Sequence, residues 1–520
     1  MHHLSVNSLE RAGLYFTVFL TGAAVMIVEL LGTRIIAPFY GASLYVWSSL
    51  ISVTMIALAL GYFIGGYWAD RVKQTRLAFI IASAALCILI IPWLTRFVLL
   101  ATDPLGLRVG AFMSALVLFS PSLTLLGMVG PFAIKLSTLT LEGVGTSVGS
   151  IYAASTLGGV AGTLFLGFYL FPRIGSYEIL MDLSMALLLL AIAVAFYERK
   201  RLRFALIFLP IILGILGINL SLQTIRSDRH VSEIYSGGEF FKILSERESL
   251  YGWVRVMDQP ARDLRLLTVD ASVIGAASIS HGENRLAYQD IVQLIPALVP
   301  HMKRALLLGQ GAGHMAITLK DRYQINTDTL EINPAVAEVA TRYFGFMPTG
   351  KRIVGDARYE IRRLKGSYDL IIHDCFTGGS EPAYLLTVEA LEELRSLLSD
   401  QGILLLNFVA FSDEGKNTAL ASVAKTIAQV FPQQLVFISE PGKDFNDFVF
   451  LAANHSINLN TSALRLKQVA WLERRQLAVD KGQGMLLTDD FYPLEQLQLR
   501  KAQYYRHTLI SWLGANILVR

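Results

Sequence analysis

Glycines and carboxylates recur at the ends of four short apolar stretches in the second half of the chain. The stretches are Leu306-Leu-Leu-Gly-Gln-Gly-Ala-Gly313, Leu330-Glu-Ile-Asn-Pro334, Val354-Gly-Asp-Ala357 and Tyr368-Asp-Leu-Ile-Ile-His-Asp-Cys375. Their spacing is that of successive strand–helix units in a doubly wound parallel sheet. Because the carboxyl ends of parallel strands share one edge, the pattern predicts a nucleotide-binding sheet with carboxylates along its working edge.

The first of these strand ends carries Gly309, Gly311 and Gly313, whose missing side chains let the backbone approach a ligand at the start of a helix. Glu331 ends the next strand about 20 residues later, where a carboxylate can accept hydrogen bonds from both ribose hydroxyls. Asp356 and Ala357 end the third strand. The three strand ends together predict a nucleoside ligand.

Asp374 ends the fourth strand and should face the same crevice. A carboxylate there can take a proton from an attacking amine, as general-base chemistry requires. The alternative is that Asp374 caps the following helix. The neighbouring Cys375 is interpreted as a small buried residue and not as a nucleophile. No cluster of His and Cys ligands is apparent, so we expect no metal.

The elements that must position these groups begin with alternating strands at 250–257 and 264–269, followed by a helix at 283–298. We therefore predict a linker and small β subdomain at 226–282 and a Rossmann-like α/β domain at 283–520. Strands and helices then alternate, which indicates a mostly parallel sheet covered by helices. The predicted segments are 305–308, 314–322, 325–331, 334–344, 352–354, 357–364, 370–373, 387–398 and 403–409.

The first part of the chain has the composition of a membrane protein. Of the 520 residues, 53% are hydrophobic and 17% charged, and the apolar residues concentrate in runs of the ~20 residues needed to span a bilayer. We predict a transmembrane helical domain at 1–225 with about seven spans. These are 13–36, 44–68, 77–100, 109–136, 148–171, 179–196 and 204–222.

Charge gives conflicting indications about orientation. The basic clusters at 71–76 and 198–203 lie between predicted spans and would place the α/β domain outside the cytoplasm. A nucleotide-type domain needs a ligand made in the cytoplasm, so we expect a multi-pass protein of the cell inner membrane with this domain on the cytoplasmic side. A re-entrant segment at 109–136, broken near Pro121 and Pro131, would reduce the conflict. The net charge of +4 is too small to indicate a nucleic-acid partner.

These motifs, in this order, resemble the spermidine synthase (polyamine aminopropyltransferase) family, and the whole chain resembles its membrane-fused bacterial branch. The resemblance also covers Glu248-Ser-Leu-Tyr-Gly-Trp-Val-Arg-Val256, Tyr288-Gln289 and Asp374-Cys-Phe-Thr-Gly-Gly-Ser-Glu-Pro-Ala383. It implies an α/β domain that uses decarboxylated S-adenosylmethionine as co-substrate and releases methylthioadenosine. Its residue roles are these: Glu331 binds the ribose, Asp356 and Ala357 flank the adenine with Pro382 near the base, Tyr288 and Gln289 border the acceptor, and Asp374 accepts the proton.

The sequence departs from the family pattern at three positions. Ala312 stands where the family has an acid in the glycine loop, Thr377 where it has a second acid after the base, and Gly252 where it has a strand glutamine. A cation that leaves water without a carboxylate partner loses charge-assisted hydrogen bonds worth roughly 1.5–3 kcal/mol each. A diamine acceptor is therefore poorly supported, and intact S-adenosylmethionine remains open as donor. Thr377 is still predicted to be a substrate-binding residue, together with Tyr288 and Gln289.

The main hypothesis is an integral membrane transferase that moves an alkyl group from intact or decarboxylated S-adenosylmethionine, with Asp374 as base. The partners expected are a small molecule, such as an amine, and the lipid bilayer; whether the chain forms a homo-oligomer is left open. One alternative is an enzyme that cleaves intact S-adenosylmethionine or transfers a methyl group from it. A non-enzymatic alternative is a transporter or sensor whose α/β domain only binds a nucleoside.

Overall fold

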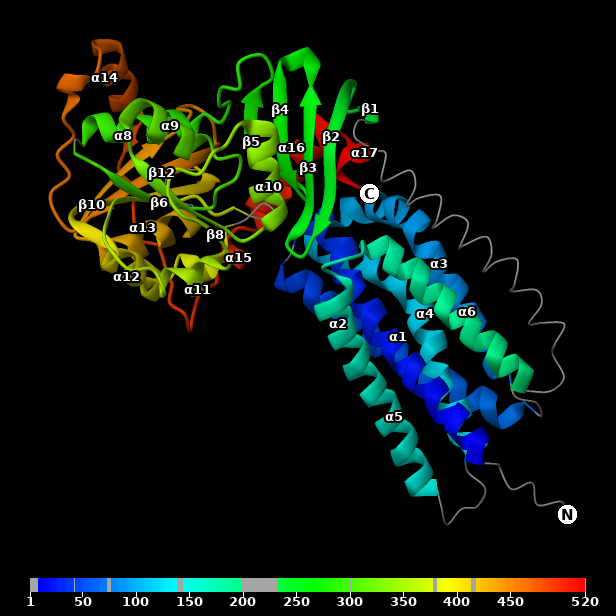
Figure 1. Cartoon of the computed structure of the whole chain (residues 1–520). Helices are drawn as coiled ribbons and strands as arrows, with labels where there is room; N and C mark the ends of the chain where they lie inside the picture. The colour runs from blue at the N-terminus through cyan, green and yellow to red at the C-terminus, as the bar shows by residue number, and fades with distance from the viewer. Residues whose placement is uncertain are drawn as a thin grey trace, which may run out of the picture. The chain divides into compact units, whose positions relative to one another are not determined.

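The computed structural model describes residues 8–41, 43–72, 76–137, 144–197, 232–299, 301–376, 381–412 and 418–519. The chain divides near residue 230 into two compact units, one helical and one α/β (Figure 1). Each unit is described by itself below.

The helical unit contains α1 (Ser8–Tyr40), α2 (Leu44–Arg71), α3 (Leu77–Thr102), α4 (Gly106–Ser137), α5 (Val144–Leu164) and α6 (Ser176–Tyr197). Among the described residues, five helical stretches are long and apolar enough to cross a bilayer, and the third, Leu77–Ser137, comprises α3 and α4 joined by a short 3₁₀ turn. Five of the predicted spans fall within α1–α4 and α6, and the predicted span 148–171 covers most of α5 and the π-helical stretch Phe165–Leu170. The seventh, 204–222, lies outside the described residues, so seven spans are not confirmed.

The predicted span at 109–136 is one continuous helix and not a re-entrant segment. Pro121 and Pro131 were considered as possible breaks, yet α4 continues through both prolines. It packs along α2 and α3, and in such a bundle neighbouring helices and hydroxyl side chains can offset the backbone bond that a proline removes. Glycines allow the close approach, since a Cβ at Gly61 of α2 would overlap the carbonyl oxygen of Thr124 in α4.

The α/β unit opens with a five-stranded antiparallel sheet. Its strands follow chain order as β1 (Ser232–Ser236), β2 (Glu239–Ser249), β3 (Gly252–Gln259), β4 (Leu264–Val269) and β5 (Ser272–Ser278). Only the regions of β3 and β4 were predicted as strands. One face of this sheet packs against the end of the chain, where Leu509, Leu513 and Ile517 join Phe241 and Leu266 in one apolar cluster.

The second sheet has eight strands in the order β13-β11-β12-β10-β9-β6-β7-β8. The parallel strands are β6 (Arg304–Leu308), β7 (Asn326–Glu331), β8 (Arg352–Val354), β9 (Tyr368–His373) and β10 (Leu398–Phe411). An antiparallel extension adds β12 (Phe445–Ala453), β11 (Gln433–Ile438) and β13 (Gln476–Leu477). Strand order reverses between β6 and β9, which is where ligands bind in sheets of this type.

Helices cover both faces of this sheet (Figure 1). On one face lie α8 (Tyr288–Leu298) and α9 (His314–Tyr323). On the other lie α11 (Ala357–Ile361), α12 (Val388–Ser396) and α13 (Thr418–Val430). The strands they cover are almost continuously apolar and buried, as in Leu306–Leu308 and Ile403–Leu406, which is the expected sequence pattern of a sheet covered on both sides.

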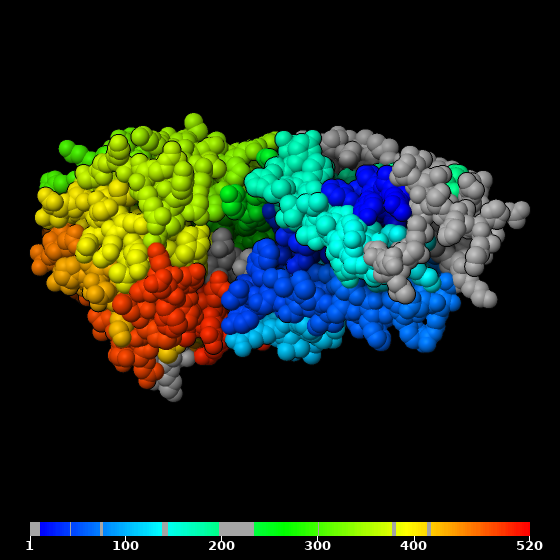
Figure 2. All heavy atoms as spheres, turned by 90° about the horizontal axis from the view of Figure 1, so that it is seen from below, coloured from blue at the N-terminus to red at the C-terminus, as the bar shows by residue number. Residues whose placement is uncertain are grey.

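Five further helices belong to the described part of the α/β unit, among them the short α15 (Leu494–Leu497) and α17 (Ala515–Leu518). α10 (Pro334–Phe344) contributes to the core of the sheet through Ala340 and packs on the antiparallel sheet through Val336 and Val339. α14 (Leu466–Glu473) lies near the sheet edge, and α16 (Leu499–Leu513) leads back to the antiparallel sheet. Figure 2 shows part of this C-terminal segment, in orange-red, on the surface of the unit beside residues coloured yellow.

Candidate active site

The glycine loop after β6 lies against the strand end that carries Asp374. Gly309 has φ +82°, and a Cβ there would overlap the carbonyl oxygen of Asp374. Gly311 has φ +52°, and its N–H donates to the Glu331 carboxylate at 3.3 Å. Both positions therefore require glycine, for backbone conformation and for space. The loop holds the ends of β6, β7 and β9 close together.

Glu331 is positioned by backbone donors at the end of β7. It is 8% exposed, and besides Gly311 it accepts a hydrogen bond from the N–H of Asn333 at 3.0 Å. Burial raises the pKa of its carboxyl to about 7, although the backbone N–H groups oppose this shift. A carboxylate whose oxygens are already oriented by N–H donors is suited to accept hydrogen bonds from the hydroxyl groups of a sugar.

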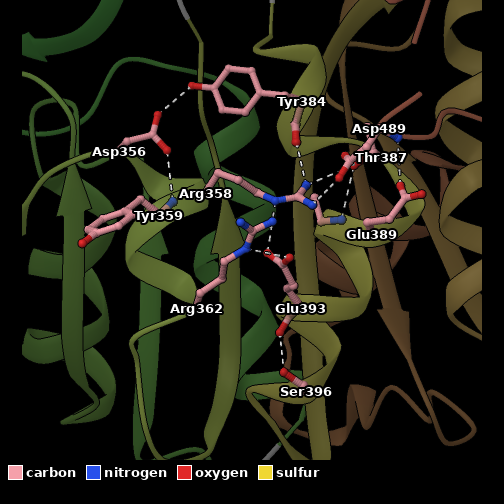
Figure 3. A network of polar contacts seen from close by, with 11 residues as sticks. Asp356, Arg358, Tyr359, Arg362, Tyr384, Thr387, Glu389, Glu393, Ser396 and Asp489 are labelled. Atoms are coloured by element: carbon pink, nitrogen blue, oxygen red, sulfur yellow. Dashed lines mark hydrogen bonds and ion pairs between the residues drawn. The ribbon is translucent and has the colours of Figure 1, made fainter. Parts of the chain in front are cut away.

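Asp356 is another of the acids at the strand ends, and it is the N-cap residue of α11. Its carboxylate accepts from the N–H of Tyr359 and from the hydroxyl of Tyr384, each at 3.1 Å (Figure 3). In the same close-up, Arg358 donates to the Tyr384 carbonyl, to Thr387 and to Asp489 at 2.7–3.1 Å. This network ties α11 to the segment after Pro382, which is the residue before the 3₁₀ turn Ala383–Leu385. Ala357 is buried beside Asp356.

Asp374 follows β9 and is held by two donors from distant parts of the chain. The Tyr288 hydroxyl donates to Oδ2 at 2.7 Å, and Nδ2 of Asn407 donates to Oδ1 at 3.0 Å. Burial raises the pKa of the Asp374 carboxyl, while these two donors lower it. Burial raises the pKa of Tyr288 well above its usual range, so the phenol stays protonated and keeps donating. The Asp374 carboxylate is therefore held in place by side chains of α8 and β10.

Cys375 directly follows Asp374 in the sequence. Burial raises the pKa of its thiol well above the usual range, and the negative charges of Asp374, Glu331 and Asp356 raise it further. The thiol therefore stays protonated, and Cys375 is only partly buried. Burial lowers the pKa of the adjacent His373 to about 4, so this imidazole is neutral.

Two of the predicted substrate-binding residues lie beside Asp374. Tyr288 and Gln289 begin α8, and Nε2 of Gln289 donates to the Tyr288 hydroxyl at 3.2 Å. Ala312 is buried against the antiparallel sheet, and Gly252 begins β3. Thr377 lies outside the described residues. Among the described residues, no group of three or more His, Cys, Asp or Glu is arranged to hold a metal ion.

Sequence reasoning missed a second polar cluster beside Asp374. Nδ2 of Asn407 also donates to Oδ1 of Asp447 on β12, at 3.3 Å. Glu381 accepts from the N–H of Val409 at 2.8 Å and from Nζ of Lys501 on α16 at 2.5 Å. One signal was available: Asn407 and Asp447 interrupt apolar strands, where a polar residue needs a reason.

Comparison with known proteins gives relatives for the α/β unit. A polyamine aminopropyltransferase of Vibrio vulnificus is 34% identical over 177 residues, covering 32% of this chain and 58% of that protein. The α/β unit is spermidine synthase-like. The spermidine synthase-like unit is also similar to an N-terminal histidine N-methyltransferase of Emericella nidulans, at 28% identity over 235 residues, covering 40% of this chain and 41% of that protein.

Among solved structures, a probable spermidine synthase from Corynebacterium glutamicum is similar to this chain at 20% identity. The match has a TM-score of 0.36 and covers 47% of this chain and 86% of that one. No family model matches the chain. The chain spans between two fifths and about three fifths of the length of the two curated relatives described above.

Proposed function

We propose that the spermidine synthase-like unit is an S-adenosylmethionine-type transferase that moves an alkyl group to an amine, with Asp374 as general base. The observation that carries the proposal is that one glycine loop contacts two of the acid-bearing strand ends, since Gly311 donates to Glu331 and Gly309 lies against the Asp374 carbonyl oxygen. The loop lies where strand order reverses in the parallel sheet. Glu331 is suited to bind the ribose, and Asp356 borders the expected place of the adenine. Asp374 is held by Tyr288 and Asn407.

In the proposed reaction the acceptor nitrogen attacks the carbon attached to the donor's sulfonium. The new C–N bond forms as the C–S bond breaks, and its electron pair goes to sulfur, which leaves as the neutral thioether methylthioadenosine. The attacking nitrogen becomes positive, and Asp374 takes one of its protons. Tyr288 and Asn407 keep the carboxylate oriented through this step. Positioned bases of this kind contribute typically 10²–10⁴-fold to a rate.

Decarboxylated S-adenosylmethionine is the donor proposed first, since the Vibrio vulnificus relative is a polyamine aminopropyltransferase. Ala312 removes a carboxylate from the glycine loop and with it a charge that would repel the carboxylate of the intact donor. The methyltransferase relative favours a second candidate, methyl transfer from intact S-adenosylmethionine. The two reactions leave different nucleosides, methylthioadenosine and S-adenosylhomocysteine.

The deciding experiment incubates the purified full-length protein with each donor and a panel of amines, and identifies the nucleoside product. Methylthioadenosine that depends on the amine supports the proposal. S-adenosylhomocysteine supports methyl transfer instead. If neither nucleoside is formed from either donor, that result contradicts an enzymatic role. The sensor hypothesis then remains.

The proposal extends to a membrane-bound enzyme of the cell inner membrane. Five helical stretches are long and apolar enough to cross a bilayer, and an adenosyl donor is made in the cytoplasm, so we place the α/β unit on that side. A C-terminal fusion to a reporter that is active only outside the cytoplasm tests this orientation. Strong reporter activity contradicts it.

A further inference from the structure

Glu29 is an acidic residue in the interior of the first apolar helix. It lies on α1, roughly two helical turns before the end of the predicted span 13–36, and its side chain is half-buried. Ionisable side chains at such a depth are costly in a bilayer, and they commonly mark the path or the binding site of an ion. The proposed transferase reaction does not use Glu29.

The Glu29 carboxyl lacks a partner among the described residues. No charged group and no hydrogen-bond donor of the described helices acts on it. The next basic residue along α1 is Arg34, whose guanidinium lies over the ring of Phe171, 4.5 Å from the ring centre. A carboxylate that is partly removed from water and has no counter-charge is unfavourable, so this position suits a bound cation.

A buried hydroxyl lies one turn further along the same face of α1. Thr33 follows Glu29 by four residues, and side chains at this spacing are neighbours on a helix surface. Thr33 is 8% exposed, and its Oγ1 has no hydrogen-bond partner among the described residues. Thr17 and Thr21, earlier in the helix, donate to carbonyl oxygens one turn back. The Thr33 oxygen therefore differs from theirs in being available to a ligand.

The face that carries Glu29 lies toward α5. Gly22 is two turns before Glu29 on this face, and a Cβ there would overlap the carbonyl oxygen of Ser155 in α5. A Cβ at Gly159 of α5 would lie 3.0 Å from the side chain of Met26. The two helices therefore approach closely here, and the turn that carries Glu29 comes next along the contact.

α5 continues into the π-helical stretch Phe165–Leu170 beside this turn. The N–H of Phe171 donates to the carbonyl oxygen of Leu166, five residues earlier, at 3.0 Å. The ring of Phe171 lies under Arg34, which places the stretch beside this part of α1. A change from α- to π-helix leaves a backbone carbonyl without its usual N–H partner, and such changes are frequent at functional sites.

From this arrangement we infer that Glu29 and Thr33 form a binding site for one monovalent cation, an alkali-metal ion or a protonated amine, inside the helical unit. The carboxylate supplies the charge, and the Thr33 hydroxyl and a carbonyl of the π-helical stretch supply further oxygens, which such cations bind. The inference does not depend on the transferase reaction. It rests on the proposed placement of the helical unit in the membrane.

The test is labelling of the full-length protein in detergent micelles with dicyclohexylcarbodiimide, which reacts with protonated carboxyls in apolar surroundings. A cation bound at Glu29 displaces the proton and blocks the reaction. At roughly ten times its dissociation constant, sodium or methylammonium chloride should slow labelling of Glu29 about tenfold relative to choline chloride at equal ionic strength. Peptide mass mapping locates the adduct, and comparison of the two salts identifies the class of cation.

Two variants separate a built site from an isolated acid. Thr33→Val keeps the side-chain shape, and it should raise the cation concentration needed for protection roughly 5- to 10-fold, the effect of losing one ligand oxygen. Its labelling in choline should match the wild type, which shows that the helical unit is folded. Asp70→Asn, at the exposed end of α2, is the matched control and should leave labelling and protection unchanged.

The inference is overturned if Glu29 is not labelled in choline, if all three salts slow its labelling equally, or if Thr33→Val is protected as well as the wild type. Should Thr33→Val be unstable, Thr33→Ser provides the second test, because it keeps a hydroxyl and must retain the protection. The membrane placement fails separately, if alkaline carbonate releases the chain from cell membranes. The nucleoside product assay is independent of both results.

Discussion

The proposed nucleoside side of the site, around Glu331, and its proposed base side, around Asp374, are assembled in different ways. On the nucleoside side, Gly311 and Glu331 belong to adjacent strand–loop units and meet through a backbone N–H. On the base side, Asp374 meets Tyr288 from 86 residues away and Asn407 from 33 residues away, and Asn407 meets Asp447 from a further 40. Backbone geometry builds the first side and side-chain packing builds the second, so the two should respond differently to substitution.

Replacing the base gives the largest expected effect. Asp374→Asn keeps the hydrogen-bonding shape but cannot accept the proton, so amine-dependent nucleoside release should fall about 10²–10⁴-fold. Affinity for methylthioadenosine should stay the same, because that ligand binds on the other side. Stopped assays and calorimetry measure the two quantities, with exposed Asp400→Asn as control. Retained turnover would show that another group removes the proton.

The proposed nucleoside side is tested by Glu331→Gln, which removes the negative charge of the carboxylate that is expected to bind the ribose. Methylthioadenosine affinity should fall roughly 10- to 100-fold, since hydrogen bonds to a carboxylate contribute roughly 1.5–3 kcal/mol. Glu338→Gln on α10 is the matched control, because that carboxylate is exposed and pairs with Arg247 at the surface. If the two variants bind the nucleoside equally well, Glu331 does not contact the ribose.

The pKa of about 7 at Glu331 gives a smaller, pH-dependent effect. The ionised carboxylate binds the ribose, so methylthioadenosine affinity should rise about tenfold from pH 6 to pH 8 and then level off. Without ligand, the folded chain binds more protons than the unfolded chain between 4.5 and about 7, so this group's contribution to the free energy of unfolding falls as pH rises through that range. A pH dependence that persists in Glu331→Gln would assign it to another group.

Tyr288→Phe should have the smallest effect, confined to the base side. The variant loses the 2.7 Å hydrogen bond that lowers the pKa of Asp374, so the acid limb of the pH–rate profile should move to higher pH. Turnover at alkaline pH should fall only a few-fold, because Asn407 still holds the carboxylate. Tyr323→Phe removes an equally short hydroxyl bond, to the Gln293 carbonyl, and should leave the profile in place.

This contrast also explains how far the sequence could be interpreted. The glycine loop and the acids at Glu331, Asp356 and Asp374 were predictable, because each directly follows a strand whose apolar pattern is local. The helix predicted from residue 283 starts only at Tyr288, since the side chain of Asn284 binds the backbone of Leu286 and holds a turn. A sequence gives only a weak signal that a side chain will bind backbone groups that a helix would otherwise use.

Asn407 and Asp447 could not be assigned from the sequence for a different reason. Their roles depend on the antiparallel register between β10 and β12, which places Asp447 opposite Val409 and within reach of Asn407. Register between strands 40 residues apart is set by tertiary packing and not by local pattern. The same holds for Lys501, whose partner Glu381 is 120 residues away.

The most direct test is an experimental structure of the full chain with methylthioadenosine bound. We predict that both ribose hydroxyls donate to Glu331, that the adenine lies beside Asp356 and Ala357, and that the sulfur points toward Asp374. The carboxylates of Asp374 and Asp447 should still share the amide of Asn407. A nucleoside bound away from Glu331, or one whose sulfur points away from Asp374, would contradict the account.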